Sequence, residues 1–138
     1  MTAGPIRTEL LHENLFLLLE PVIVSIGQIR VIVPDGYVTD FTSIPPVLHW
    51  WIRPTDRRGA RAAVVHDWIY HTHIYPRCIA DAIFQVVLRK DGMPRSKAKA
   101  LTSAVHAFGK RAYMRGPDKL RERAPGLAKY IKVTSIIE

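Results

Sequence analysis

Short apolar runs alternate with turn residues along the first third of the chain. The runs are rich in β-branched residues, and breaks such as Glu20-Pro21 and Gly27-Gln28 separate them. Short, branched runs of this kind favour strands rather than helices. The runs cover residues 15–19, 22–26 and 29–33. Together with the Pro34-Asp35-Gly36 turn, they predict a small antiparallel β-meander within residues 1–36.

The spacing of apolar residues changes after this meander. Residues 37–56 show no regular period and carry Pro45 and Pro46 among short hydroxyl side chains, which predicts a rigid, extended loop. From residue 57 onward the apolar positions recur with a helical period. The breaks in that period are Ile74-Tyr75-Pro76, Asp91-Gly92 and Gly116-Pro117. We therefore expect helices over residues 57–72, 77–90 and 93–114.

The remaining segment is a basic tail, in which the alternation over residues 130–134 is compatible with a late strand. With 138 residues and 48% hydrophobic content, the chain is long enough for one hydrophobic core. We expect a single domain of the α+β class. Its parts are the β-meander (1–36), the rigid loop (37–56), a helical core of about three helices (57–115) and the tail (116–138).

The chain is basic, with a formal net charge of +8 and a pI of about 10.0. Basic residues concentrate between Arg89 and Arg123, but they are dispersed among apolar residues rather than gathered in a run. Such a surface suits anionic lipid or an acidic neighbouring protein, and it favours nucleic acid less. A solvated helix face that only keeps the protein in solution explains the same pattern, so both interpretations stay open.

Neither a secretory signal nor a membrane span is expected. The segment from Met1 to Glu9 lacks the apolar stretch that follows the basic start of a signal peptide. The apolar residues 15–26 are interrupted by Glu20-Pro21 and are too few to cross a bilayer.

The candidate chemistry lies on the first two expected helices. His66 and Tyr70 are four residues apart and therefore share one helix face, while Asp67 points about a quarter-turn away. Asp81 lies among apolar residues of the next helix, and a short antiparallel connection would bring it toward His66. A buried His or Asp needs a hydrogen-bonded partner or a metal. An Asp that faces an imidazole fixes its tautomer, as in a general base.

Asp40 is a further candidate carboxylate, in the proline-stiffened loop beside hydroxyl residues such as Thr42 and Ser43. With Asp67 it could give two hard oxygen ligands to Ca²⁺, and loop carbonyls and waters could complete the shell. The same residues also fit a turn whose side chains satisfy backbone N–H groups. The sequence leaves both alternatives open, and it equally allows His66 to be an ordinary hydrogen-bonded core histidine.

Other polar residues near this cluster are assigned no chemistry. His71 and His73 follow the first helix, and we expect both to be exposed. Cys78 is the only cysteine, so an internal disulfide is excluded, and we expect its thiol to serve packing.

Three motifs together resemble an uncharacterised family found in tailed bacteriophages and prophages. They are Val33-Pro34-x-Gly36-Tyr37-x-Thr39-Asp40-Phe41-Thr42-Ser43-Ile44-Pro45, Ala63-x-x-His66-Asp67-x-x-Tyr70 and Ala80-Asp81-x-x-Phe84. The resemblance covers about residues 10–115. It implies a phage protein encoded among tail or lysis functions, located in the virion tail or in the host cytoplasm before assembly, with other tail proteins as partners. It implies no particular reaction.

The helix pair is also similar to that of phospholipases A2, which carry H-D-x-x-Y on one helix and an Asp followed by x-x-Phe on the next. The resemblance implies that His66 is the base for a water and that Asp81 orients it. It makes Tyr70 a supporting hydroxyl and Asp67 a Ca²⁺ ligand. Asp40-Phe41-Thr42-Ser43 departs from the glycine-rich calcium loop of those enzymes, and a single cysteine excludes their disulfides.

Two functions follow as expectations. The first is Ca²⁺-assisted ester hydrolysis by a phage protein of the tail or the cell envelope. Its catalytic residues would be His66, Asp81 and Tyr70, with Asp67 and Asp40 near the metal. The second is a non-catalytic tail component, in which the same cluster is a buried polar lock between the helices and the loop.

Overall fold

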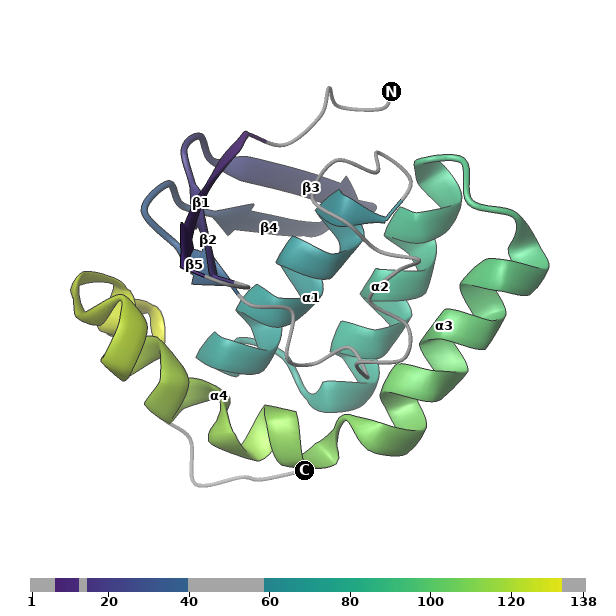
Figure 1. Cartoon of the computed structure of the whole chain (residues 1–138). Helices are drawn as coiled ribbons and strands as arrows, with labels where there is room; N and C mark the ends of the chain where they lie inside the picture. Colours follow the sequence, from purple (N-terminus) through teal and green to yellow (C-terminus); the bar gives the residue numbers. More distant parts are fainter. Residues whose placement is uncertain (1–6, 13–14, 40–58, 133–138) are drawn as a thin grey trace.

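The computed structural model describes residues 7–12, 15–39 and 59–132, and an N-terminal antiparallel β-meander precedes four helices in this part of the chain (Figure 1). The predicted α+β class is therefore confirmed. The strands are β1 (Thr8–His12), β2 (Leu15–Leu18), β3 (Val22–Ile26), β4 (Ile29–Val33) and β5 (Val38–Thr39). The helices are α1 (Ala60–Thr72), α2 (Arg77–Lys90), α3 (Arg95–Phe108) and α4 (Lys110–Arg123), and a 3₁₀ helix, η2 (Pro125–Tyr130), follows.

The strands form two small antiparallel sheets. β1, β2 and β5 pair in that order, and β3 pairs with β4. Alternate residues of the second sheet point to opposite faces, as the pleat of a strand requires. Val24 and Val31 are buried in the core, whereas Ile23 and Ile32 are exposed on the outer face. The predicted hairpin over residues 22–33 is thus confirmed, with one face packed against the helices.

The expected boundary between meander and loop, at residue 37, is wrong. Val38 and Thr39 form β5 and pair with Leu17 and Phe16 of β2. This pairing satisfies backbone groups that would be buried without partners in an irregular loop, because both β5 residues are buried. Residues 40–56 of the expected rigid loop lie outside the described residues.

α1 is the central helix of the molecule. It runs between the strands and α2, α4 packs across its C-terminal end, and α3 lies on the far side of α2 (Figure 1). Every residue of α1 is buried. A helix buried all round has no need of a polar face, which explains the nearly continuous apolar sequence around His66 and Asp67. Polar residues on this helix must therefore find partners inside the protein.

The third expected helix, over residues 93–114, is two helices in the structure. α3 ends at Phe108 and α4 begins at Lys110, with Gly109 at the corner. A Cβ at Gly109 would lie 2.8 Å from the Tyr70 hydroxyl and would overlap the carbonyl oxygen of Val105. The absence of a side chain therefore lets the chain turn close to α1, and α4 curves past the end of α1 (Figure 1).

The expected helix stop at Gly116-Pro117 is also wrong, because α4 continues to Arg123. Pro117 has no N–H, so the carbonyl of Tyr113 lacks its usual helical donor. The His73 ring supplies the bond instead: Nε2 lies 2.6 Å from the Tyr113 oxygen, and the two rings stack with centroids 3.9 Å apart. A donor from another helix thus makes an internal proline tolerable.

The described part of the expected late strand, residues 130–132, is not a strand. Tyr130 ends η2, and Lys132 donates its backbone N–H to the Thr72 oxygen at 2.7 Å. The tail is thereby joined to the end of α1, where helix carbonyls lack internal partners. Residues 133–134 lie outside the described residues. None of the described helices is long and apolar enough to cross a membrane.

Candidate functional site

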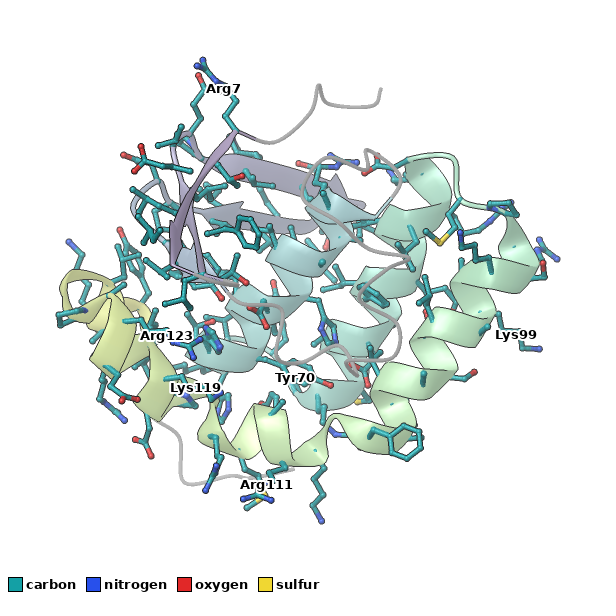
Figure 2. The ribbon with its side chains drawn as sticks, in the orientation of Figure 1. Arg7, Tyr70, Lys99, Arg111, Lys119 and Arg123 are labelled. Carbon is teal, nitrogen blue, oxygen red and sulfur yellow. The ribbon has the colours of Figure 1, made fainter. Side chains whose placement is uncertain are left out.

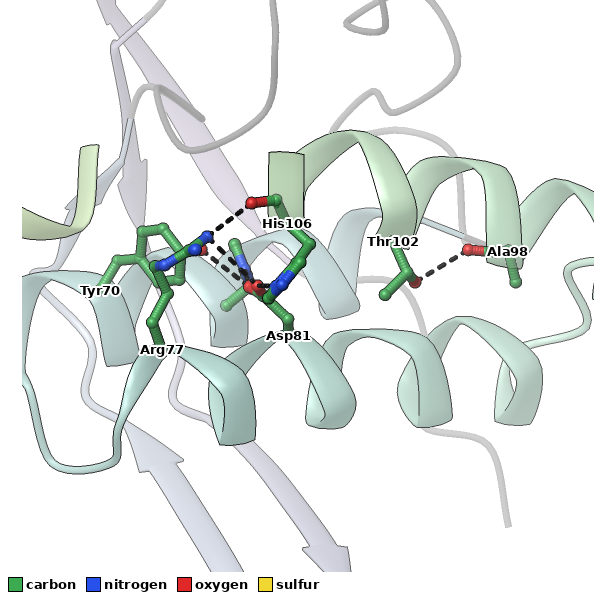
Figure 3. Close-up of polar contacts among 7 residues, drawn as sticks. Tyr70, Arg77, Asp81, Ala98, Thr102 and His106 are labelled. Atoms are coloured by element: carbon green, nitrogen blue, oxygen red, sulfur yellow. Dashed lines mark hydrogen bonds and ion pairs between the residues drawn. The ribbon is translucent and has the colours of Figure 1, made fainter. Parts of the chain in front are cut away.

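Two adjacent helices bring the predicted acid–base residues together in the core. His66 and Tyr70 lie one turn apart on α1, and Asp81 faces them from α2. The His66 Nε2 and Asp81 Oδ1 atoms are 2.7 Å apart, and the Tyr70 hydroxyl donates to the same oxygen at 2.7 Å. Figure 3 shows Tyr70 approaching the Asp81 carboxylate from the neighbouring helix. The structure therefore makes the His66–Asp81 pairing that the sequence predicted.

A tight connection between the helices produces this geometry. His73 caps α1 in the left-handed conformation, with φ at 56°, and donates its N–H to the carbonyl of Ile69. Pro76 is the N-cap residue before α2, and its carbonyl accepts a helical bond from the Ala80 N–H at 3.0 Å. Because the connection is short, the second turn of α2 lies opposite the last turns of α1. Asp81 is on that second turn.

The second oxygen of Asp81 has partners that sequence reasoning did not assign. His106 on α3 places Nδ1 3.0 Å from Asp81 Oδ2. Arg77 places Nη1 3.6 Å from the same oxygen and donates to the backbone carbonyl of His106 at 2.8 Å. Figure 3 shows Arg77 and His106 converging on Asp81. The carboxylate thus joins three helices.

The protonation state follows from these contacts. Burial alone would raise the pKa of Asp81, but hydrogen bonds from His66, Tyr70 and His106 outweigh burial and hold it below its ordinary value. An ionised carboxylate only accepts, so His66 must carry its proton on Nε2 toward Asp81. In that tautomer the Nδ1 atom of a neutral imidazole carries no proton.

The Tyr70 hydroxyl, by contrast with the Asp81 carboxylate, keeps its proton. Burial, reinforced by the bond to Asp81, raises the pKa of the Tyr70 hydroxyl far above its ordinary value of 10.0. The phenol therefore remains a protonated donor over the whole range in which Asp81 is ionised. It steadies the carboxylate and takes no part in acid–base exchange near neutral pH.

The cluster is enclosed on its His66 side and reaches the surface at His106. The rings of Tyr70 and Phe84 pack on the His66 ring, with centroids 4.1 and 4.8 Å away. His66 is 0% exposed and Asp81 3% exposed, whereas the His106 side chain is 60% exposed. A line of polar groups therefore leads from the core to solvent.

The predicted metal ligands are not brought together in the described part of the structure. Asp67 is fully buried and accepts a hydrogen bond from the Thr39 hydroxyl of β5. Asp40 lies outside the described residues. Among those that are described, no group of three or more His, Cys, Asp or Glu side chains could hold a metal ion. Ca²⁺ takes six to eight oxygen ligands, and Asp67 is the one predicted ligand that lies in the described part of the chain.

Three expectations about neighbouring residues are wrong. His71 is buried rather than exposed, and its Nδ1 lies 2.7 Å from the Tyr37 hydroxyl. His73 is half-buried because it supports α4 at Tyr113. Cys78 is exposed at the start of α2 and does not serve packing. The two histidines are covered because α4 and Tyr37, directly before β5, pack on the end of α1, which the local sequence does not reveal.

Of the two Asp81 partners that the sequence analysis missed, Arg77 and His106, only Arg77 could have been found from local spacing. Arg77 lies four residues before Asp81, and this spacing places two helical residues on one face. His106 is 25 residues from Asp81 along the chain. No periodicity relates residues so far apart, and only the packing of α3 on α2 brings them together.

Comparison with known proteins places this site within a family. The model of a family described as "Protein of unknown function (DUF1353)" matches residues 16–105, which include His66, Asp67, Tyr70 and Asp81. The uncharacterised protein y4iH of Sinorhizobium fredii (strain NBRC 101917 / NGR234) is 38% identical over 74 residues. These residues are 53% of this chain and 31% of y4iH, so the chain spans about a third of that relative's length. No solved structure matches the chain. Because the family model covers more than half of the chain, this protein belongs to the DUF1353 family.

Proposed function

We propose that this chain is a phage or prophage protein, acting in the tail or at the cell envelope, that hydrolyses an ester with His66 as the general base. The observation that carries the hydrolytic part is the pair of 2.7 Å contacts to Asp81 Oδ1, from His66 Nε2 and the Tyr70 hydroxyl. These are the residues to which the similarity with phospholipases A2 assigns base, orienter and supporting hydroxyl. The resemblance of the three motifs to a family found in tailed bacteriophages and prophages supports the phage part.

Because His66 is 0% exposed, this mechanism requires its enclosed side to open and admit water and the ester. His66 Nδ1 then takes a proton from water while the water oxygen attacks the carbonyl carbon of the ester. Asp81 keeps the opposite nitrogen protonated and stabilises the imidazolium that forms. When the tetrahedral intermediate collapses, the ester C–O bond breaks and the imidazolium returns its proton to the departing alkoxide. A carboxylic acid and an alcohol leave. A positioned base of this kind contributes about 10²–10⁴-fold to the rate.

Anionic lipid is the substrate surface and partner that the charge favours. α4 carries basic side chains at Lys110, Arg111, Arg115, Lys119, Arg121 and Arg123, against the acidic Asp118 and Glu122. Figure 2 shows Arg111 directed away from the body of the molecule. Phe108 and Met114 are 75% and 65% exposed beside these charges. Exposed apolar groups next to basic ones suit the surface of an anionic bilayer.

The calcium requirement is a separate prediction, and no step above depends on it. Asp67 is the described member of the predicted pair, and its carboxylate is already bonded to Thr39. Activity that disappears with a chelator and returns with added Ca²⁺ would support the requirement. Equal activity with and without the chelator would overturn it and leave the His66 proposal standing.

The test uses purified full-length protein with vesicles of phosphatidylglycerol or phosphatidylcholine, together with a soluble nitrophenyl ester. We expect release of fatty acid or nitrophenol by the wild type, faster on anionic vesicles, and none by His66→Ala. Lys99→Ala is the matched control, because Lys99 is an exposed residue of α3 (Figure 2) and should leave the rate unchanged. A wild type that cleaves neither substrate, or a His66→Ala variant as active as the wild type, overturns the proposal.

A second candidate, the non-catalytic tail component, is favoured by a different observation. His66 and Asp67 are both 0% exposed, and each has a polar partner from another element. Through these bonds α1 is fastened to α2 and to β5, as a polar lock would do. Under this reading His66→Ala has no activity to remove. It instead lowers stability by about 3–5 kcal/mol, because Asp81 loses a buried partner.

Both candidate functions place the protein in a phage, and finding where the protein is located tests that shared part. Mass spectrometry of purified particles, induced from a host whose prophage encodes this chain, measures whether the protein is in the virion. Stoichiometric presence in the particle supports a tail component. Presence only in the lysate contradicts a tail location for either candidate.

A further inference from the structure

The polar groups around Asp81 form a line from the core to the surface, and its outer member is His106. His66 and Tyr70 both bond to Oδ1, which leaves Oδ2 for the partners on the other side. His106 Nδ1 lies 3.0 Å from Oδ2, within hydrogen-bond distance. Arg77 is 3.6 Å from that oxygen, beyond a good hydrogen bond. Among the described residues, His106 is therefore the hydrogen-bond donor to Oδ2.

The His106 ring is held in place despite its exposure. Its own backbone carbonyl accepts a bond from Arg77 at 2.8 Å, which ties the last turn of α3 to the first turn of α2. The adjacent Val105 is buried in the core, together with Leu101 one turn earlier. These contacts hold the last turn of α3 against the start of α2, next to Asp81. The ring then reaches the carboxylate without disturbing the packing of α3.

We infer that His106 is a positioning residue for the His66–Asp81 pair and that α3 is therefore part of the site. A carboxylate bonded on Oδ1 alone can swing about its χ angles, and His66 Nε2 would follow it or lose its bond. A donor on Oδ2 removes that freedom. His106 acts through Asp81 and does not touch the reacting atoms. Its effect on catalysis rests on the proposed function, whereas its effect on the His66–Asp81 bond does not.

The inference is tested first by a measurement that needs no activity. Protein labelled with ¹⁵N-histidine is studied by NMR near neutral pH, and the His66 proton on Nε2 is followed. A proton donated to a buried carboxylate resonates far downfield and exchanges slowly with water. In His106→Phe, which keeps a ring of similar size but cannot donate, we expect an upfield shift and exchange broadening. His106→Gln, whose amide can donate to Oδ2, should restore much of the wild-type signal.

The control is Lys99→Ala, seven residues earlier on the same face of α3, and it should not move the signal. A His66 signal in His106→Phe that matches the wild type overturns the inference. So does an equal shift in His106→Phe and His106→Gln, because the donor would then not matter. Both variants lie at a largely exposed position, so folding is expected and is checked by circular dichroism.

The ester assay adds a second readout that a merely structural role would not move. His106→Phe should lower kcat more than it raises KM, and His106→Gln should recover kcat. If the wild type hydrolyses no ester, the proposed function fails, and the NMR comparison still decides the positioning role. If the wild type is active but His106→Phe has unchanged kcat and an unchanged His66 signal, the positioning role fails and the proposed function stands.

Discussion

Replacing Asp81 by Asn is the sharpest perturbation of the cluster, because it removes one charge and keeps the size of the side chain. The wild-type carboxylate accepts bonds from His66 and Tyr70 at 2.7 Å and from His106 at 3.0 Å. An amide offers one accepting oxygen, and its NH₂ group must face a donor on the other side. At least one of the three bonds is therefore lost, and the remaining ones lose the assistance of the charge.

The magnitude follows from these three bonds. A hydrogen bond to a charged group contributes about 1.5–3 kcal/mol, compared with about 0.5–1.5 kcal/mol for a neutral pair. Loss of the charge therefore weakens each bond by about 1 kcal/mol. Burying an amide costs less desolvation free energy than burying a carboxylate, and this difference offsets part of the lost hydrogen-bond energy. We expect Asp81→Asn to lower the free energy of unfolding by about 2–4 kcal/mol near neutral pH.

The stability difference between wild type and Asp81→Asn should depend on pH in a defined direction. The pKa of Asp81 in the folded protein is below its ordinary value of 3.8. A lowered pKa adds to the free energy of unfolding. This contribution is complete above the ordinary pKa and is lost as pH falls through the pKa of the folded protein. Asn cannot titrate. The difference in stability between wild type and Asp81→Asn should therefore be large near neutral pH and shrink below about pH 4.

Urea unfolding followed by tryptophan fluorescence measures this difference, because Trp68 is buried in the core. Asp118→Asn is the matched control, since that carboxylate is 84% exposed and its pairing with Arg121 is at the surface. Equal stability of Asp81→Asn and wild type near neutral pH would refute the reasoning. A penalty that persists undiminished in acid would refute it as well, because the loss would then not come from the charge.

Three further predictions concern the contacts that support the site. Gly116→Ala should destabilise by about 2 kcal/mol or more in urea unfolding, because its Cβ would overlap the Tyr70 carbonyl, whereas Gly126→Ala, with open space around it, should be nearly neutral. Equal effects would contradict the close approach of α4 to α1. His73→Ala should cost about 1–3 kcal/mol by removing the donor to the Tyr113 carbonyl. Hydrogen exchange should then speed up selectively in the second half of α4, and uniform exchange rates would contradict the role of His73. The raised pKa of Tyr70 adds stability that is present below about pH 10 and is lost as pH rises through the folded value. In Tyr70→Phe the free energy of unfolding should fall less at alkaline pH than in the wild type. An equal fall in both proteins would contradict this prediction.

Local periodicity was sufficient to predict the elements that depend on local sequence. The alternation over residues 22–33 predicted β3 and β4, and the helical spacing predicted α1 and α2 nearly to their ends. It failed where a distant segment decides the local structure. β5 is a strand only because β2 lies beside it. α4 passes through Pro117 only because His73, 40 residues before the Tyr113 carbonyl that it caps, supplies the missing bond.

The same division explains what the sequence revealed of the site. His66 and Asp81 were visible because each lies among apolar residues of its helix, where a polar side chain needs a partner, and a short connection limits where that partner can be. His106 was not visible, because it is exposed and an exposed histidine in a basic helix has no unusual local context. Its importance arises only from the oxygen of Asp81 that the two α1 residues leave for another partner. A buried acid–base pair can thus be predicted from one stretch of chain, whereas the residue that connects it to the surface requires the packing of a third helix.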